Sequence, residues 1–417
     1  MNTNRLTFRC ATADDAAPIM EVLEAFDRRD RGTDGWAVRR QSIADDAGQW
    51  RVGELHGQLV SAINVPAGAV WFGRSRFVWA DVGEVSVLPG MQNQGIGTDA
   101  MHDAVAWQVE RGIGVSRLGG LIRFYRRAGY EPFPRQYIEI PIHDAITAGA
   151  SRLSIPELLT PNDGDVGRVR PVDLSTDDEA VRHVVAAHNR HRTGCRVLDP
   201  SLSGLLRGQK GIVCERTGKV CGFASFAVHE HDGGAFEGGL SAYVMAYLPD
   251  CVPALEAMIK HLYRHAHEVG ARRMTVLLPP DAATLGDLPM LGINYNVCQE
   301  FGRIAGNMIR IINLRQLLAD SADELQRRVE PIGWRGQIRF DLGDQHASLR
   351  MGDEGVEVRG DNDSDDADVA LKFTHTELLR MVLGVMPPAW MERIGADHPA
   401  YGFLAAMFPP TVGGYTT

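Results

Sequence analysis

The chain has 417 residues, which is too long for one ordinary hydrophobic core and indicates two or three domains. Hydrophobic residues make up 44% and charged residues 23%, a composition typical of soluble globular proteins. The formal net charge is −10 with no basic block, which argues against a nucleic-acid or anionic-membrane partner and mildly favours cationic ligands.

Cysteine usage and the lack of long apolar segments indicate a cytoplasmic protein. The six cysteines are scattered and form no C-x-x-C pair, so we expect reduced thiols rather than disulfides or a zinc framework. The N-terminal residues contain no apolar run, and we therefore expect no secretory signal. The apolar stretch at 378–391 is interrupted by Arg380 and by two prolines, and it falls short of the about 20 residues that a membrane span needs.

The first ~145 residues alternate strand-like and helix-like patterns, which is typical of an α/β domain. Residues 6–9 alternate as a strand, and Thr12-x-x-Asp15 then resembles the start of a helix. The segment 51–64 predicts a hairpin that turns near His56-Gly57, and residues 77–88 predict another long strand.

A second, similar pattern follows a linker that we predict over about 141–165. Residues 169–171 predict a strand, and 176–179 open a helix, as the segment after Arg9 does about 163 positions earlier. We interpret this echo as an internal repeat of the whole domain. The second copy continues with predicted strands near 211–228, 240–248 and 273–278 and a helix over about 253–268.

A third pattern begins near Leu314 and predicts an α+β domain. A helix containing Leu317 and Leu325 precedes alternating strands between residues 338 and 373. Thr374-x-x-Glu377 is a capping box for a helix that stops at Gly384.

The segment Gln92-x-x-Gly95-x-Gly97 lies between the strand that ends at Leu88 and a helix predicted to start at Thr98. Backbone N–H groups in such a turn point outward together with the helix dipole, and they form a site for a diphosphate. Glycine is needed where the backbone approaches a phosphate without a Cβ in the way. No Gly-Lys-Ser/Thr follows, and no acidic residue ends a following strand about 20 residues on, so neither a Walker loop nor a Rossmann fingerprint is present.

This segment resembles the pyrophosphate loop of the GCN5-related N-acetyltransferases, and Phe124-Tyr125-Arg126-Arg127-Ala128-Gly129-Tyr130 resembles their second hallmark. The resemblance implies an acetyl-CoA-dependent transferase with Tyr125 as general acid. Gln92 and Asn93 stand where many relatives carry arginine, which predicts weaker cofactor binding. The resemblance also implies the residues that contact the cofactor: Val85, Ser86, Val87, Asn93, Gln94, Gly95, Ile96, Gly97, Thr98, Gly120 and Leu121.

The order of the three patterns resembles the Eis-type (enhanced intracellular survival) acetyltransferases, which join two GCN5-related folds to a sterol-carrier-like domain. We therefore predict a catalytic domain over 1–148, a degenerate second fold over 149–312 and a sterol-carrier-like domain over 313–417. The second fold lacks glycine at 246–253, the counterpart of the loop, and is expected to bind no cofactor. The resemblance implies an amine acceptor (an aminoglycoside, a polyamine or a lysine side chain) and a homohexamer.

The same resemblance implies that the C-terminal carboxylate of Thr417 is the general base, with Glu84 and Asp27 as alternatives. We expect no metal, because His261, His265 and His267 lack a completing ligand. Two alternatives stay open: an acyl group longer than acetyl, and a non-catalytic protein whose third domain binds a lipid or another small molecule.

Overall fold

The computed structural model describes residues 6–24, 32–142, 167–197, 202–206, 209–229, 238–278, 282–288, 294–352, 355–360, 367–391, 394–395 and 397–410. The chain divides into two compact units, and each is assembled from separated segments. The first unit contains residues 1–69, 77–134 and 301–379, and the second contains residues 70–76, 135–300 and 380–417. Most of the predicted linker at 141–165 falls outside the described residues.

The helices and strands up to residue 189 are β1 (Thr7–Cys10), α1 (Ala16–Glu24), α2 (Gly32–Asp45), β2 (Trp50–Leu55), β3 (Gln58–Asn64), β4 (Ala67–Phe72), β5 (Ser75–Val87), α3 (Ile96–Glu110), β6 (Val115–Leu121), α4 (Ile122–Tyr125), β7 (Glu131–Pro132), β8 (Arg135–Pro141), β9 (Arg168–Pro171) and α6 (Asp178–Asn189). They are followed by β10 (Arg196–Val197), α7 (Leu202–Leu206), β11 (Lys210–Arg216), β12 (Lys219–Val228), β13 (Gly239–Tyr247), α8 (Val252–Glu268), β14 (Arg273–Val276), α9 (Ala282–Asp287), β15 (Asn296–Glu300) and β16 (Ala305–Ile311). The last elements are α10 (Leu314–Val329), β17 (Gly336–Asp341), β18 (His346–Gly352), β19 (Gly355–Arg359), β20 (Val369–Lys372), α11 (His375–Val382) and α12 (Tyr401–Met407).

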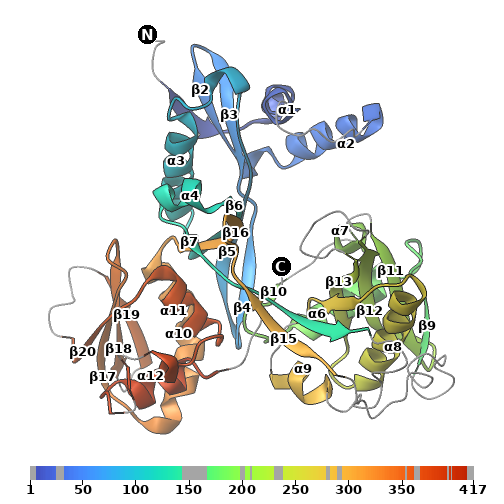
Figure 1. The fold of residues 1–417 in the computed structure, drawn as a ribbon. Coiled ribbons are helices and arrows are strands. Elements are labelled where there is room, and N and C mark those ends of the chain that lie inside the picture. The colour runs from blue at the N-terminus through green and yellow to red at the C-terminus, as the bar shows by residue number, and fades with distance from the viewer. Residues whose placement is uncertain are drawn as a thin grey trace. The chain divides into compact units, whose positions relative to one another are not determined.

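The main sheet of the first unit has the strand order β1–β2–β3–β5–β6–β16–β7 (Figure 1). Strand β16 comes about 190 residues after β6 in the chain, yet it pairs antiparallel with β6 along its whole length, from Ala305↔Leu121 to Ile311↔Val115. Helix α3 buries Met101, Ala104 and related side chains in the core beneath this sheet. The sheet is therefore completed by a strand from a distant part of the chain.

The sheet of the second unit has the matching order β9–β11–β12–β13–β14–β8–β15. Here the inserted strand is β8, which pairs antiparallel with β14 on one edge and with β15 on the other. The pair β13–β14 is parallel, as is the pair β5–β6 in the first sheet. Two sheets of one topology confirm the prediction of tandem α/β folds. The first sheet contains β16 and, paired with β4, the short strand β10 from outside the predicted segment, and the second contains β8.

Strand β8 lies within the predicted domain 1–148 but pairs in the second sheet, and β16 lies within 149–312 but pairs in the first. The predicted limits at 148 and 312 therefore follow the order of the folds along the chain. Whether they also bound separate domains stays a prediction. Both strands were overlooked in the sequence, because each is short and its pairing partners lie far away in the chain.

The third sheet has the order β19–β18–β17–β20, and helix α10 packs against β18 and β19. The predicted capping box at the start of α11 is present: the N–H of Thr374 donates to Glu377 over 2.8 Å. The N–H of Glu377 in turn donates to the Thr374 hydroxyl over 3.1 Å. An α+β arrangement is confirmed for this segment.

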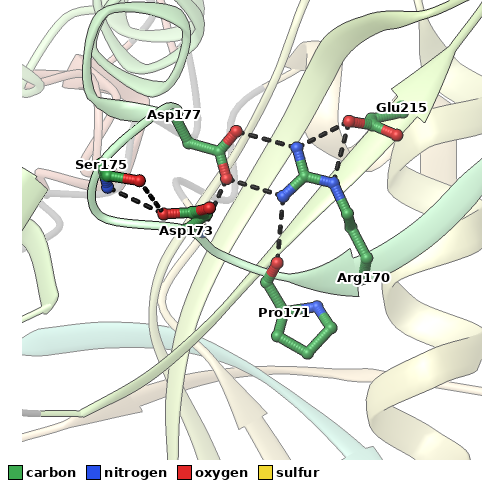
Figure 2. Close-up of polar contacts among 6 residues, drawn as sticks. All are labelled: Arg170, Pro171, Asp173, Ser175, Asp177 and Glu215. Atoms are coloured by element: carbon green, nitrogen blue, oxygen red, sulfur yellow. Dashed lines mark hydrogen bonds and ion pairs between the residues drawn. The ribbon is translucent and has the colours of Figure 1, made fainter.

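In the second sheet the guanidinium of Arg170 holds two carboxylates (Figure 2). It donates to Asp177 from Nη1 and Nη2 over 2.7 and 2.8 Å, and to Glu215 from Nε and Nη2 over 2.8 and 2.6 Å. Asp177 also accepts from the N–H of Asp173 over 2.7 Å, so it joins strand β9 to the start of α6. The hydrogen bonds from Arg170 hold the pKa of Asp177 below its ordinary value, against the opposing effect of burial.

The first sheet contains the same network around Arg9. Its Nη1 and Nη2 each donate to Asp15 over 2.7 Å, and its Nε donates to Glu54 over 3.5 Å. The N–H of Thr12 donates to Asp15 over 2.7 Å, as the capping pattern predicted. Hydrogen bonding from Arg9 lowers the pKa of Asp15 to about 2. A shared network at the same place in the strand order supports the interpretation of an internal repeat.

The substitution Asp177→Ala should lower the free energy of unfolding by about 2–3 kcal/mol at neutral pH, because it removes charge-assisted hydrogen bonds to a buried carboxylate. Because the pKa of Asp177 is lower in the folded than in the unfolded protein, its ionised form stabilises the fold. This contribution to the free energy of unfolding is fully present above the unfolded pKa of about 3.9 and is lost as the pH falls through the folded pKa. The difference between the two proteins, measured by urea unfolding, should therefore shrink between pH 5 and pH 2. Arg182→Ala, which breaks an exposed pair with Asp178, should cost no more than about 0.5 kcal/mol. An Asp177→Ala deficit that does not change with pH would contradict this account.

Candidate active site

The first sheet opens where its two central parallel strands part. Strand β5 pairs with β6 from Trp79 to Val82, opposite Val115 to Leu118. Past Val82, β5 continues to Val87 and β6 continues to Leu121 without further pairing between them in the described residues. Backbone groups on the two facing edges are then available to a ligand. Val85, Ser86 and Val87 lie on one edge of this opening, and Gly120 and Leu121 lie on the other.

A bulge in β5 adjoins the point where the strands part. Asn64 of β3 pairs with Gly83 and Ala62 pairs with Ser86, so two residues of β5 are left without a direct partner on β3. One of them is Glu84, whose φ of 51° lies in the left-handed region. Such a conformation costs about 1–3 kcal/mol, and bulges of this kind are frequent beside active sites. The carboxylate of Glu84 forms an ion pair with Arg39 of α2.

The loop before α3 has the properties of an anion-binding turn. Asn93 has a φ of 61°, and Gly95, with a φ of 88°, is the residue that precedes the helix. Helix α3 begins at Ile96, so the predicted start at Thr98 was wrong by two residues. The carbonyl of Gly95 already accepts helical hydrogen bonds from the N–H groups of Thr98 and Asp99. Among the described residues, none accepts a hydrogen bond from the N–H groups of Asn93, Gln94 or Gly95.

The two glutamine side chains of this loop are directed to its own backbone. Gln92 donates to the carbonyl of Val87, and Gln94 donates to that of Gly90, each over 3.1 Å. They therefore stabilise the loop and leave its backbone donors to bind an anion. These donors and the positive end of the α3 dipole together suit a diphosphate.

Two close approaches place Tyr125 against the opening. A Cβ on Gly120 would lie 2.5 Å from Cε2 of Tyr125, so the ring lies directly over the β6 backbone. A Cβ on Gly97 would lie 3.4 Å from the ring of Phe124, which brings the start of α3 next to α4. The rings of Phe124 and Tyr125 meet edge to face with their centroids 4.8 Å apart.

Tyr125 is a protonated phenol in a mostly buried position. Burial raises its pKa to about 12, and the neighbouring Tyr130 adds to this effect. Tyr130 is fully buried, and its hydroxyl lies 2.7 Å from that of Ser116. Tyr125 thus keeps its proton at neutral pH and is present as a proton donor.

The turn after α4 is held by a residue that the sequence did not suggest. The carbonyl of Ala128 accepts a hydrogen bond from Nη1 of Arg310 over 2.7 Å. Gly129, with a φ of 75°, lies so close to this guanidinium that a Cβ would be 2.8 Å from Nη1. Arg310 lies on β16, about 180 residues further along the chain, and no local motif marks it.

Two of the predicted general bases, Thr417 and Asp27, lie outside the described residues. Within the part of the chain that the structure describes, no cluster of three or more His, Cys, Asp and Glu side chains is arranged to hold a metal ion. The helices of that part include none that is both long enough and apolar enough to cross a membrane.

The second fold differs from the first at the corresponding place. Strand β13 also continues past its last pairing with β14 at Ala242, but its end is already hydrogen-bonded. Nδ1 of His188 lies 3.1 Å from the carbonyl oxygen and 3.3 Å from the amide nitrogen of Tyr247, and the Tyr247 hydroxyl donates to Asp287 over 2.7 Å. Burial lowers the pKa of His188 to about 3, so the ring is neutral, and its tautomer decides which of the two Tyr247 backbone atoms it bonds. The segment that leads into α8 contains no glycine.

No protein-family model matches the sequence, and no curated protein matches it. Solved structures do resemble the chain over nearly its whole length. A GCN5-related N-acetyltransferase from Anabaena variabilis is 16% identical with a TM-score of 0.64, and the match covers 97% of each chain. A probable N-acyltransferase from Enterococcus faecalis is 15% identical with a TM-score of 0.64, covering 92% of this chain and 91% of the other.

Eis1 from Mycobacterium abscessus is 16% identical with a TM-score of 0.60, covering 99% of this chain and 97% of the other. Likeness at this level of identity shows the fold. The chain therefore has the fold of the GCN5-related N-acetyltransferases, and the similarity extends over both sheets and the C-terminal segment.

Proposed function

We propose that this chain is an acetyl-CoA-dependent N-acetyltransferase that transfers the acetyl group to a primary amine. The observation that carries the proposal is the group of unbonded N–H donors at Asn93–Gly95, next to the opening between β5 and β6 and to Tyr125. The loop would hold the diphosphate through Asn93 to Thr98, and the strand edges at Val85–Val87 and Gly120–Leu121 would hold the pantetheine and the acetyl group. The named acetyltransferases that share the fold support this assignment.

The reaction needs a neutral amine, donors for the developing oxyanion, and a proton for the leaving thiolate. The amine nitrogen attacks the thioester carbonyl, so that a C–N bond forms and the C–S bond breaks as the intermediate collapses. Tyr125 gives its proton to the sulfur, and a base removes the proton that the nitrogen carries. Backbone N–H groups on the β5 edge next to the bulge are the donors that suit the oxyanion.

Transfer of the Tyr125 proton to a thiolate would be unfavourable if the thiolate had the pKa of a thiol in water. Its pKa of about 12 exceeds the ordinary thiol value of about 8.5 by roughly 3.5 units, or about 5 kcal/mol. The same burial that raises the pKa of the phenol also raises that of a thiolate formed beside it, which narrows this difference. A thiolate formed in this desolvated site is therefore a stronger base than it would be in water.

Thr417 is the general base in this proposal, acting through the terminal carboxylate, as the Eis-type resemblance implies. Glu84 is the alternative, but a carboxylate paired with Arg39 would have to give up that partner to take a proton. Deleting Thr417 should lower kcat about 10- to 1000-fold and leave KM for acetyl-CoA nearly unchanged. Full activity in this variant, with loss of activity in Glu84→Gln, would assign the role to Glu84.

The proposal also covers the second fold, the acceptor, the location and assembly of the protein, and the last domain. The second fold acts as a scaffold without cofactor, because the backbone of Tyr247 is already hydrogen-bonded to His188 where the first fold has its opening. An aminoglycoside, a polyamine or a lysine side chain is the acceptor. The protein is cytoplasmic and assembles as a homohexamer, and its last domain is sterol-carrier-like, as in Eis-type enzymes. Eis1 of Mycobacterium abscessus, which matches over 99% of this chain, supports this grouping.

Tyr125→Phe should lower kcat for acetyl transfer about 100-fold or more, because it removes the proton donor and keeps the ring. Thiol release from acetyl-CoA, measured against aminoglycosides, polyamines and lysine peptides, gives the rate and the acceptor. In the wild type kcat should not fall between pH 7 and pH 10, because a pKa of about 12 keeps Tyr125 protonated.

Calorimetry is the control for this variant, and acetyl-CoA should bind to Tyr125→Phe with nearly the affinity of the wild type. Turnover in Tyr125→Phe equal to that of the wild type would exclude Tyr125 as the acid. Absence of both turnover and acetyl-CoA binding in the wild type would overturn the proposed function.

A further inference from the structure

The guanidinium of Arg310 joins the turn behind Tyr125 to the C-terminal sheet segment. Nη1 donates to the carbonyl of Ala128 over 2.7 Å, and Nη2 pairs with Oδ2 of Asp344 over 2.9 Å. Asp344 lies between β17 and β18. Arg310 lies on β16, and its side chain is mostly buried. The planar guanidinium bonds the two acceptors with separate N–H groups in a fixed arrangement.

Asp344 is itself held in place from α11. Nε2 of His375 lies 3.1 Å from Oδ1 of Asp344, and Nδ1 of the same ring accepts the N–H of Ile311 over 3.1 Å. Because Nδ1 accepts, the proton of the neutral ring is on Nε2 and is donated to Asp344. Burial lowers the pKa of His375, which agrees with a neutral ring. Ile311 follows Arg310 on β16, so the contacts form a closed loop: β16, Asp344, His375 and back to β16.

A second pair of contacts ties α11 to the end of the same turn. The N–H of Thr376 donates to Glu131 over 2.7 Å, and its hydroxyl donates to the carbonyl of Pro132 over 3.0 Å. Glu131 and Pro132 form β7, directly after Tyr130. The turn from Tyr125 to Pro132 is therefore bonded at its middle by Arg310 and at its end by Thr376.

One side of this turn faces open volume, although Ala128 and Tyr130 pack in the core on its other side. A cavity of about 610 Å³ lies against it, lined by Arg126, Gly129, Glu131, Leu342, Asp344 and His375 among others. On the side of the cavity, hydrogen bonds and ion pairs take the place of apolar packing. The hydrogen bonds of Arg310 then set where the turn, and the tyrosine before it, can lie.

We propose that Arg310 and Asp344 are positioning residues for Tyr125, so that the C-terminal segment sets the placement of the proton donor. The role of Tyr125 here rests on the proposed function, whereas the linkage of Arg310 and Asp344 to the turn rests on the contacts alone. Within the described residues, neither side chain is hydrogen-bonded or ion-paired to the strand edges or the loop that would hold acetyl-CoA. Their loss should therefore affect the chemical step and spare cofactor binding.

The test compares Asp344→Ala with Glu357→Ala in the full chain. Glu357 pairs with Arg359 over 2.9 Å in the same sheet, the same distance as the pair of Asp344 with Arg310, and it takes no part in the linkage. Trypsin cleavage after Arg126 and Arg127, both exposed in the turn, reports on the linkage without any need for activity. Asp344→Asn keeps one oxygen that can accept from Arg310 and serves as the conservative variant.

Asp344→Ala should be cleaved in this turn about 5-fold faster than the wild type or Glu357→Ala, at an unchanged unfolding midpoint. Its kcat should fall about 10-fold with KM for acetyl-CoA within about 2-fold, and Asp344→Asn should recover part of the loss. Equal cleavage rates in Asp344→Ala and Glu357→Ala would overturn the linkage, and a rise in KM without a fall in kcat would overturn the positioning role. If the wild type turns over no amine, the failure is that of the proposed function, and the cleavage rates still decide whether the linkage exists.

Discussion

The pairing of β16 with β6 is the interaction on which the rest of the site depends. Past Val82, β6 has parted from β5. Among the strands that the structure describes, Ala305 to Asn307 of β16 alone pair with the last residues of β6, Gly119 to Leu121. The opposite edge of β16 pairs with β7, and its Arg310 holds the turn between α4 and β7. One strand therefore supports the wall of the opening and also the turn that carries Tyr125.

This dependence explains how an open cleft can exist in a stable sheet. Two parallel strands that part would each leave an unpaired edge, and an unsupported end of β6 would not keep a fixed position. With β16 in place, the backbone of Gly120 is fixed closely enough for the Tyr125 ring to rest on it, at a spacing that excludes any Cβ. Pairing of β6 with β16, which comes about 190 residues later in the chain, offsets the free energy lost where β5 and β6 part.

The two folds share a topology and differ at the place of the proposed site. Both have the same order along the main path of the sheet, and both are completed by a strand from outside, β16 in one and β8 in the other. Both also contain an arginine that holds an aspartate and a glutamate, Arg9 in one and Arg170 in the other. They differ where the central strands part: the first has a loop with free N–H groups, and the second has Tyr247 bonded to His188. Shared topology therefore does not imply shared chemistry, which resides in the loop.

Features encoded locally were predictable from the sequence, and features that depend on distant pairing were not. The hairpin at His56-Gly57 followed from turn residues, and both have positive φ as that turn requires. The capping box at Thr374 followed from a four-residue pattern. The start of α3 was placed too late, because a glycine in the left-handed region before a helix has no distinct signature. Arg310 and β16 could not be assigned, since seven residues give no indication of a partner about 190 positions away.

Hydrogen exchange with and without acetyl-CoA tests the central claim most directly, because it reports on backbone N–H groups in both folds at once. The account predicts slower exchange at Asn93–Gly97 and at Gly119–Leu121 when acetyl-CoA is added, and no change at residues 246–253 of the second fold. Unchanged exchange in the first fold, or protection that appears in the second, would contradict it.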